Sequence, residues 1–340
     1  MLITVFTPTY NRAHLLPRLY ESLCKQTFKD FEWLIVDDGS TDETREVIEN
    51  FNLNGNGNND RHHENFNFNA NVNNDRLPLT PSNLEGELRN GENNPCEIPE
   101  KSFPIRYIYK ANGGKHTAIN VGAKEAKGEL FFIADSDDML PVNALEDVAK
   151  MYEGIKEDKS FAGVVGMDSK INGDKINEGY NFDVLDCTEV EIRYKYHFKG
   201  DMKEVFRTNV LREFPFPEIE GEKFCPEELQ LIRISTKYKF RYYNKIIYIA
   251  DYQQNGLSSK IIKIRMDSPI SAMMNYSENI SFKIPLSQKI KNAINYWRFY
   301  YCINKKSHNK KLPAISFAWY WTKPIGWLMH LNDIRKTSCK

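Results

Sequence analysis

Three carboxylates stand close together in the segment Asp135-Ser136-Asp137-Asp138. The apolar run 130–134 comes directly before them and is typical of a buried strand, so the acids are expected where that strand ends. Like charges this close repel one another unless a cation lies between them. Because Mg²⁺ commonly binds one or two protein carboxylates together with substrate phosphates, the segment predicts a divalent-metal site. A solvated acidic turn before a helix that starts near Pro141 is the alternative.

Two further loops combine residue types that suit a phosphorylated ligand. Asp37-Asp38-Gly39-Ser40 follows the apolar run 31–36, and its acids could bind a ligand or could form a turn in which Ser40 caps a helix. Asn112-Gly113-Gly114-Lys115 lies where a strand gives way to a helix, so backbone amides and a lysine could receive phosphate oxygens. The phosphate loop G-x-x-x-x-G-K-[ST] and the dinucleotide fingerprint G-x-G-x-x-G are absent, which argues against nucleoside triphosphatases and dehydrogenases.

These loops need strands to bring them together, and the sequence supplies an alternation of strands and helices. Over the first 166 residues, short apolar runs alternate with helical periodicity. The predicted strands are residues 2–6, 31–36, 105–109, 130–134 and 161–166. This order predicts an α/β fold with a mostly parallel sheet that helices cover on both faces. Ligands of such sheets bind beyond the carboxyl ends of the strands, where all three loops are expected.

Several blocks in a fixed order resemble glycosyltransferase family 2. They are Thr4-Val5-Phe6-Thr7-Pro8-Thr9-Tyr10-Asn11-Arg12, Gln26-Thr27-Phe28, the stretch 33–42, Asn112-Gly113-Gly114, and Asp135-Ser136-Asp137-Asp138, which looks like the family's DxD signature. The resemblance covers roughly residues 2–51 and 104–255. It implies a Rossmann-like GT-A fold and inverting transfer of a sugar from a nucleotide diphosphate, as in bacterial polysaccharide synthesis. The sequence departs from the family pattern in an Asn-rich insert and at Ile119, where many relatives carry arginine.

The same resemblance implies roles for individual residues. Pro8 and Tyr10 would lie at the nucleotide, with Tyr10 against the base, and Asp38 would bind the uracil edge of a UDP-sugar. Asp135 would lie on the ribose side and, together with Asp137, would hold Mn²⁺ or Mg²⁺. The metal would neutralise charge on the leaving nucleotide, so the reaction would need no protonating acid. Lys115 is the nearest candidate for a further cation that faces the diphosphate.

A single displacement also needs a general base that takes the proton of the acceptor hydroxyl. In the family this base is an acid at the start of a helix in the second half of the chain. The sequence offers Glu227 as the first choice, Glu228 as the second and Asp201 as the third. Proline followed by two glutamates is also an ordinary helix start, because acids there are favoured by the helix dipole.

The resemblance predicts a metal-dependent hexosyl- or N-acetylhexosaminyltransferase that acts on a hydroxyl of a glycan or a lipid-linked glycan. A sugar-phosphate nucleotidyltransferase is an alternative, although it would need a glycine-rich loop where this chain has Pro8-Thr9-Tyr10-Asn11. A non-catalytic membrane-associated scaffold is the other alternative. The acids of the two acidic blocks, within residues 33–42 and 135–138, are present, which argues against a decayed site.

The predicted domain organisation is a catalytic domain over residues 1–265 and a helical tail, rich in aromatic and basic residues, over residues 266–340. Within the domain, residues 52–103 form an insert, residues 104–166 complete the nucleotide-sugar half, and residues 167–265 form the acceptor half. The stretch 50–94 holds sixteen asparagines in 45 residues. Such a segment has little apolar surface to bury and is expected to be disordered.

Charge is distributed unevenly along the chain, although 46 Lys and Arg balance 46 Asp and Glu overall. Residues 281–340 hold twelve Lys and Arg against the single acid Asp333, a charge of +11, together with four of the five tryptophans. Basic residues and aromatic rings favour an anionic membrane surface, so the tail predicts peripheral attachment to the inner face of the cytoplasmic membrane. Packing of these aromatics on the catalytic body is the alternative. No secretory signal, disulfide framework or zinc motif is evident, and no nucleic-acid partner is expected.

Overall fold

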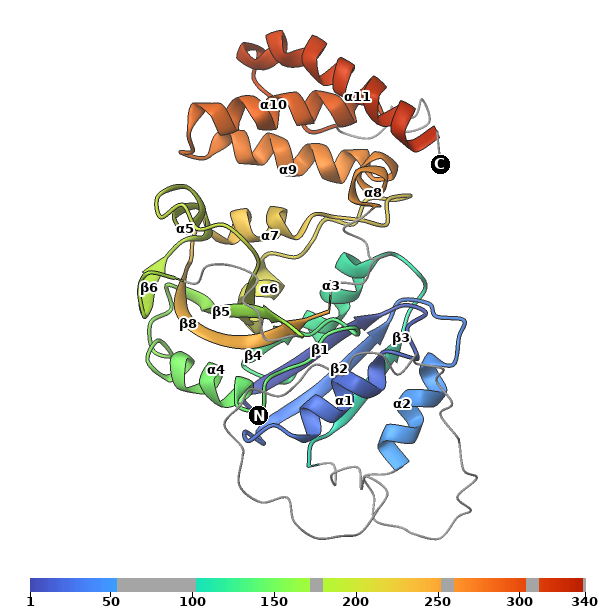
Figure 1. Ribbon diagram of the computed structural model, residues 1–340, viewed down its shortest axis with the longest axis vertical. Coiled ribbons are helices and arrows are strands. Elements are labelled where there is room, and N and C mark those ends of the chain that lie inside the picture. The colour runs from blue at the N-terminus through green and yellow to red at the C-terminus, as the bar shows by residue number, and fades with distance from the viewer. Residues whose placement is uncertain (54–101, 172–179, 252–259, 304–311, 339–340) are drawn as a thin grey trace.

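The computed structural model describes residues 1–53, 102–171, 180–251, 260–303 and 312–338 (Figure 1). Most of the predicted insert, residues 54–101, therefore lies outside the described residues. The remainder forms an α/β body with a stack of helices at one end, and the C-terminal helix lies farthest from the sheet (Figure 1).

The body is built on one eight-stranded sheet in the order β3-β2-β1-β4-β7-β5-β8-β6. The strands are β1 Ile3–Thr9, β2 Phe31–Asp37, β3 Ile105–Tyr109, β4 Leu130–Ile133, β5 Phe161–Lys170, β6 Val184–Cys187, β7 Met202–Arg207 and β8 Lys239–Ala250. Parallel pairs join β1 to β2 and β4, β2 to β3, and β5 to β8. The pairs β4–β7, β5–β7 and β6–β8 are antiparallel. The predicted α/β class with a mostly parallel sheet is confirmed.

Helices cover both faces of the sheet because successive strand side chains point to opposite sides. Ile3 and Val5 of β1 face a core shared with α1 Leu16–Cys24, α2 Thr44–Leu53 and α4 Ala144–Glu153. Phe6 faces a second core shared with α3 Lys115–Glu125, α6 Thr208–Glu213 and α7 Glu227–Ile234. Figure 1 shows these two sets of helices on opposite sides of the sheet.

Strand β7 enters the sheet between β4 and β5 and runs against both of them. Its register places Val205 opposite Phe132 of β4 and Phe206 opposite Phe131. The first residues of β7 consequently lie beside the carboxyl end of β4, where the acidic segment begins. This arrangement brings Lys203 and Glu204 next to a loop that is about 70 residues away in the sequence.

The tail is helical, as expected, and its first helices dock on the body. Helix α8 Ile261–Asp267 spans the predicted boundary at residue 265. It is followed by α9 Pro269–Ser281, α10 Leu286–Tyr300, the 3₁₀ helix η3 Phe317–Thr322 and α11 Lys323–Ser338. Glu222 accepts hydrogen bonds from the backbone amides of Ile270 and Ser271 at 2.7 and 2.8 Å, and so caps the start of α9. Arg233 of α7 forms an ion pair with Glu278 of α9. Within the described residues, no helix is long and apolar enough to span a bilayer.

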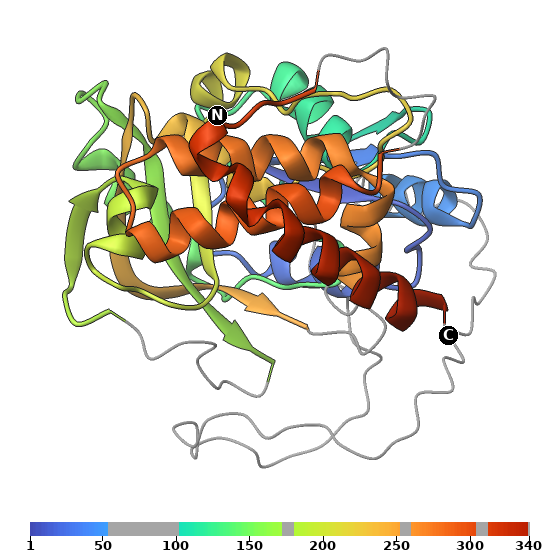
Figure 2. The ribbon, with the colours of Figure 1, turned by 90° about the horizontal axis from the view of Figure 1, so that it is seen from above.

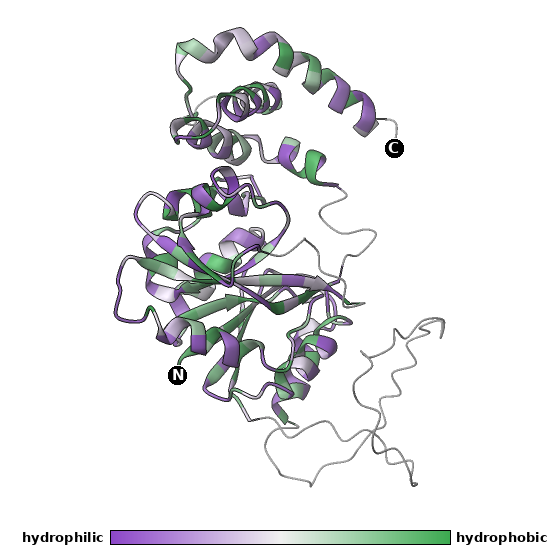
Figure 3. Cartoon of the chain, turned by 60° about the vertical axis from the view of Figure 1, so that its left-hand side comes forward, coloured by the Kyte–Doolittle hydropathy of each residue, from purple (hydrophilic) through white to green (hydrophobic). Residues whose placement is uncertain are grey.

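The aromatic residues of the tail divide into a buried and an exposed set. Tyr296, Trp297 and Phe299 of α10 are buried in a core with α9. By contrast Phe317, Tyr320, Trp321 and Trp327 are exposed on η3 and α11, the outermost layer in Figure 2. Figure 3 shows apolar residues interspersed with polar ones along that layer. The predicted membrane surface is therefore reduced to η3 and α11, because the aromatics of α10 pack inside the tail.

Candidate functional site

The acidic segment lies at the carboxyl end of β4, as the sequence predicts. Asp135 accepts a salt bridge from Lys115 at 2.8 Å, and Asp137 accepts one from Arg12 at 2.6 Å. Burial would raise the pKa of Asp135, but the positive charges of Lys115, Lys203 and Arg12 outweigh it and lower the pKa to about 2. Asp135 is thus held as a carboxylate, and both acids are paired with cations that come from other strand ends.

Asp138 points inward and has a different environment. The Tyr248 hydroxyl donates to its Oδ2 at 2.7 Å, and the Asp251 amide donates to its Oδ1 at 2.8 Å. Burial, followed by the negative charge of Asp135, raises the pKa of Asp138 to about 6. Its contacts show a structural role in holding the segment against β8.

The predicted metal pair, Asp135 and Asp137, remains partly open to solvent. Within the described residues, no group of three or more His, Cys, Asp or Glu is arranged to hold a metal ion. The donor set is accordingly two carboxylates, and this suits Mn²⁺ or Mg²⁺ only if substrate phosphates complete the coordination. Both residues offer the carboxylate oxygens that such an ion prefers, but a bound ion would have to share or displace Lys115 at Asp135 and Arg12 at Asp137. The metal assignment itself stays a prediction.

Asp38 is buried and both of its carboxylate oxygens are engaged by the loop between β3 and α3. Lys110 Nζ lies 2.5 Å from Oδ1, and the amides of Gly113 and Gly114 donate to Oδ1 and Oδ2 at 2.9 and 2.7 Å. Asn112 Nδ2 donates to Oδ2 at 3.2 Å. In this conformation the predicted contact with a uracil edge would have to compete with four donors from one loop. That contact stays a prediction, but the structure shows that Asp38 organises the Gly113-Gly114 turn.

The first block and the second acidic loop are joined through Asn11, which has a positive φ of 52°. The Asn11 amide donates to Ser40 Oγ at 2.8 Å, and its Oδ1 accepts from the Thr41 amide at 2.8 Å. Ser40 therefore does not cap the following helix, which begins at Thr44 with Asp42 accepting from the Thr44 amide. Tyr10, next to this junction, is 48% exposed and its ring is available for stacking, whereas Pro8 lies within the buried strand β1.

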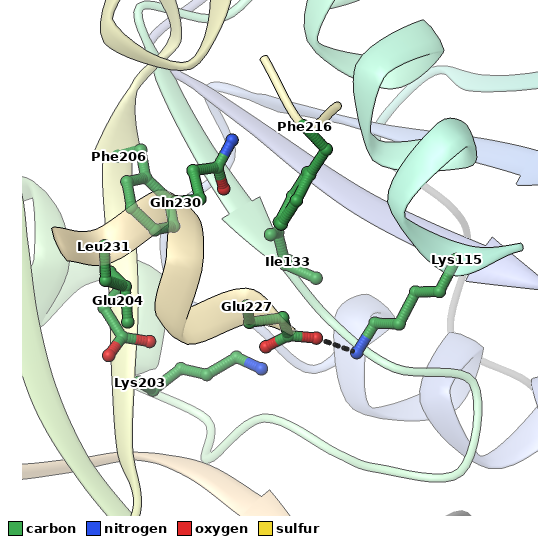
Figure 4. Close-up of a pocket in the computed structure, with 9 residues that line it drawn as sticks. All are labelled: Lys115, Ile133, Lys203, Glu204, Phe206, Phe216, Glu227, Gln230 and Leu231. Carbon is green, nitrogen blue, oxygen red and sulfur yellow. Dashed lines mark ion pairs between the residues drawn. The ribbon is translucent and has the colours of Figure 1, made fainter. Parts of the chain in front are cut away.

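A pocket lies between the end of β4, the start of β7 and helix α7. Figure 4 shows the residues that line it: Lys115, Ile133, Lys203, Glu204, Phe206, Phe216, Glu227, Gln230 and Leu231. Glu227 is the first residue of α7 and follows Pro226, which is the N-cap of the helix. Lys115 Nζ lies 2.8 Å from Glu227 Oε1, and this ion pair crosses the pocket from α3 to α7.

The three acids proposed as general base occupy different places. Glu227 lines the pocket. Glu228 turns away to α9, where the side-chain amides of Asn275 and Asn279 donate to its two oxygens at 2.9 and 3.2 Å. Asp201 is exposed before the start of β7 and does not line the pocket. Among the three, Glu227 is the acid whose position suits an incoming acceptor, although its catalytic role stays a prediction.

Sequence reasoning missed the residues that β7 contributes to the pocket. Lys203 and Glu204 line it, yet neither belongs to a recognised block. Burial, followed by the negative charge of Glu189, raises the pKa of Glu204 to about 8. Residues 202–207 show no regular alternation of polar and apolar side chains, so no local signal could have placed Lys203 and Glu204 at a pocket.

The arrangement combines two features that suit displacement at a charged leaving group. Carboxylates and cations alternate along one edge of the sheet, where a diphosphate and a metal ion can balance their charges. Glu227, at the start of α7, lines the adjacent pocket and is linked to Asp135 through Lys115. A carboxylate in this position can take a proton from a hydroxyl nucleophile.

Comparison with known proteins identifies one family that matches this chain. The model of glycosyl transferase family 2 matches residues 4–74 and 96–211, and so includes the three strand-end loops and β7. A chondroitin synthase from Pasteurella multocida strain Pm70 and a hyaluronan synthase from Pasteurella multocida are each 26% identical to this chain over 251 residues. The aligned part is 73% of this chain and 20% of each relative, so the chain spans about a fifth of their length.

Solved structures share the fold at low identity. Staphylococcus aureus TarS 1–349 in complex with UDP-GlcNAc has a TM-score of 0.55 and 16% identity over 99% of this chain and 92% of that chain. A mannosyltransferase from Pyrobaculum calidifontis in complex with GDP-Man and Mn²⁺ has a TM-score of 0.52 and 16% identity, over 97% of this chain and 87% of that chain. These similarities establish the expected GT-A fold.

Proposed function

This chain belongs to glycosyl transferase family 2, and from that premise we propose that it transfers a sugar, with inversion, from a nucleotide diphosphate to a hydroxyl of a glycan. One observation carries the proposal. A single ammonium group, that of Lys115, lies 2.8 Å from Asp135 at the end of β4 and 2.8 Å from Glu227 at the start of α7. Lys115, which lines the pocket, therefore links the carboxylate assigned to the donor to the acid assigned to the acceptor.

The proposed donor is a UDP-sugar that carries a hexose or an N-acetylhexosamine. Support comes from the neighbouring fold, since TarS was solved with UDP and with UDP-GlcNAc. The exposed ring of Tyr10 offers a stacking surface beside the Asp38 loop. The mannosyltransferase neighbour was solved with GDP-Man instead. The experiment below therefore compares donors with different nucleobases.

In the proposed mechanism each residue of this chain has a defined task. Asp135 and Asp137 would hold Mn²⁺ or Mg²⁺, which when bound neutralises negative charge on the diphosphate leaving group. Glu227 accepts the proton of the acceptor hydroxyl as that oxygen attacks the anomeric carbon from the face opposite the leaving group. Lys115 pairs with both Asp135 and Glu227 and so keeps the two carboxylates within reach of one ammonium group. Phe206, Phe216 and Leu231 restrict water at the attacked carbon.

A panel of nucleotide sugars tests this function directly. Full-length protein is incubated with UDP-glucose, UDP-GlcNAc, UDP-glucuronic acid and GDP-mannose, each with and without Mn²⁺, and released nucleotide is measured. We expect release of UDP that depends on the metal and increases with a glycan acceptor. Release of pyrophosphate from a nucleoside triphosphate and a sugar phosphate would instead identify the alternative nucleotidyltransferase. Inactivity and lack of binding toward every donor would favour the scaffold alternative.

We further propose that the protein attaches peripherally to the inner face of the cytoplasmic membrane and that its acceptor is a lipid-linked glycan. The exposed side chains of Phe317, Trp321, Trp327 and Leu328 supply an apolar outer face on η3 and α11. Asp333, the one acid of residues 281–340, is buried and forms an ion pair with Arg298, so it does not oppose binding to anionic lipid. Arg335 and Lys336 are exposed at the end of α11.

Co-sedimentation with anionic vesicles tests the attachment. We expect full-length protein to pellet with phosphatidylglycerol vesicles at low salt, and the double variant Trp321→Ser/Trp327→Ser to pellet less. Tyr196→Ser is the matched control, because Tyr196 is an exposed aromatic residue of the body. Equal pelleting of all three proteins, or pelleting of none, would contradict the membrane proposal while leaving the catalytic one intact.

A further inference from the structure

Two lysines line the pocket, and only one of them is paired within the part of the chain that the structure describes. Lys115 forms ion pairs with Asp135 and Glu227. Lys203 enters from β7, on the opposite side in Figure 4, and has neither an ion pair nor a side-chain hydrogen bond to a described residue. Its ammonium group therefore keeps three donors for a ligand.

The Lys203 ammonium is nevertheless held in place. It lies 3.6 Å from the centroid of the Tyr248 ring, in a cation–π contact. The Tyr248 hydroxyl in turn donates to Asp138 Oδ2 at 2.7 Å and accepts from the Asp135 amide at 2.8 Å. The ring that positions Lys203 is thus fixed to the same loop that carries the predicted metal-binding acids.

Surrounding charges show what kind of ligand the ammonium would meet. The Lys203 ammonium lies over the Tyr248 ring, and the Tyr248 hydroxyl contacts Asp138 and the Asp135 amide, so the ammonium lies beside the acidic segment. Within the described residues it forms an ion pair with none of these acids. An ammonium group held in this way beside a crowded acidic edge is suited to a polyanion that enters between them.

The other cations at this edge already have partners. Arg12 pairs with Asp137, Lys110 with Asp38, and Lys115 with Asp135 and Glu227. A diphosphate that enters next to these acids needs positive charge that the acids have not yet neutralised. Among the described lysines that line the pocket, Lys203 alone supplies it.

We propose that Lys203 binds the diphosphate of the donor, with the Tyr248 ring holding its ammonium group ready. The proposal rests on the proposed glycosyl transfer and names a binding residue that the sequence did not reveal. Lysine suits this task, because its ammonium is a compact charge that can follow a phosphate oxygen as the leaving group separates. Lys203 would then complement the metal ion on the opposite side of the diphosphate.

Calorimetric titration of full-length protein with UDP and with uridine, in the presence of Mn²⁺, tests the proposal. Because hydrogen bonds to charged groups contribute about 1.5–3 kcal/mol, Lys203→Met should weaken UDP binding about 10- to 100-fold and leave uridine binding unchanged. Lys203→Arg should recover a large part of the loss. Lys195→Met is the matched control, because Lys195 also lies over a tyrosine ring but on the surface, and it should bind UDP like the parent.

Several outcomes would overturn the assignment. UDP affinity that is equal in Lys203→Met and the parent protein contradicts it. A loss that affects UDP-glucuronic acid but spares UDP would place the ammonium at the sugar rather than the diphosphate. If Lys203→Met unfolds, Lys203→Gln gives the same test, and failure of Lys203→Arg to restore binding counts against a role for the charge. If the parent protein itself binds no nucleoside diphosphate, the result contradicts the proposed glycosyl transfer, and the role of Lys203 falls with it.

Discussion

Lys115 Nζ lies 2.8 Å from Glu227 Oε1, so one ion pair joins the start of α3 to the start of α7 across the pocket. Burial would lower the pKa of Lys115, but the charges of Asp135 and Glu227 outweigh it and raise the pKa well above its ordinary value. Both helices begin at this contact, and both follow loops that carry candidate site residues. Separation of Lys115 from Glu227 is therefore the movement that would free Glu227 for an acceptor.

Replacing Glu227 by glutamine should preserve donor binding and remove most of the transfer. The amide keeps the size of the side chain but cannot accept a proton, and general bases typically contribute about 10²- to 10⁴-fold to a rate. Steady-state transfer with a metal and a saturating donor measures the loss in kcat, while calorimetry measures donor affinity.

Glu228→Gln is the matched control for that experiment. Glu228 accepts from Asn275 and Asn279 of α9, so its change should lower the melting temperature and leave kcat within a fewfold of the parent. An inactive Glu228→Gln beside an active Glu227→Gln would show that the adjacent acid is the base. Activity in both variants would move the search to Asp201.

Asp137→Ala should abolish transfer while the protein stays folded. Asp137 contributes an oxygen to the predicted metal pair, and its loss also leaves Arg12 without its carboxylate partner. We expect no rescue by additional Mn²⁺, together with a lower affinity for Mn²⁺ in the presence of UDP, measured by electron paramagnetic resonance. Turnover close to that of the parent at saturating Mn²⁺ would exclude Asp137 as a metal ligand.

The sequence predicted the parts of the fold that depend on local pattern. The strand predicted at residues 105–109 coincides with β3, and the helix expected near Pro226 begins at Glu227. These elements have short apolar runs or a distinct start, which the sequence displays without knowledge of distant contacts. The order of the blocks likewise identified the loops that the sheet brings together.

The remaining features depend on contacts between distant residues. β7 pairs with β4 across about 70 residues, and no local pattern in either strand indicates its antiparallel direction. The capping role expected for Ser40 was wrong, because Ser40 accepts the Asn11 amide instead and Asp42 serves the helix. Trp297 belongs to the aromatic residues from which a membrane surface was predicted, but it is buried against α9. In each case a contact with a residue that is distant in the sequence determines the local structure.

Asp38→Ala should raise the donor KM and reduce stability together. Its carboxylate organises Lys110 and the amides of Gly113 and Gly114, so removal leaves a half-buried ammonium and two amides without their acceptor. Breaking a buried pair in this way costs about 3–5 kcal/mol. Donor titration and thermal unfolding measure the two effects, and an unchanged donor affinity would remove Asp38 from the nucleotide site.

Gly114→Ala should distort the loop between β3 and α3, because the added methyl group would clash with a neighbouring residue. Gly114 has a φ of +97°, and a Cβ there would lie 1.9 Å from the carbonyl oxygen of Lys223. Gly221→Ala is the matched control, since its φ is +82° but nothing lies within 4 Å of its Cβ. We expect the control to lose about 1 kcal/mol from backbone strain alone, and Gly114→Ala to lose more and to bind UDP weakly. Equal melting temperatures for the two variants would contradict the close approach of Lys223.

Asp168→Asn should stabilise the protein at alkaline pH and should do so less as the pH falls. Asp168 is buried on β5, its Oδ1 has no hydrogen-bond partner in the described structure, and burial raises its pKa to about 7 against the opposing charge of Lys203. The folded protein then holds this proton more tightly than the unfolded chain, whose aspartate has a pKa of about 3.9. Stability therefore declines as the pH rises from about 4 to about 7 and stays low above that range. Asparagine cannot ionise, so the variant should unfold at a higher temperature than the parent at pH 8, with the difference shrinking toward pH 5.

Asp158→Asn is the control. Hydrogen bonds from Ser160 lower the pKa of Asp158, so replacing this carboxylate should bring no gain in stability at pH 8. A difference between Asp168→Asn and the parent that does not change between pH 5 and pH 8 would show that Asp168 is ionised throughout that range.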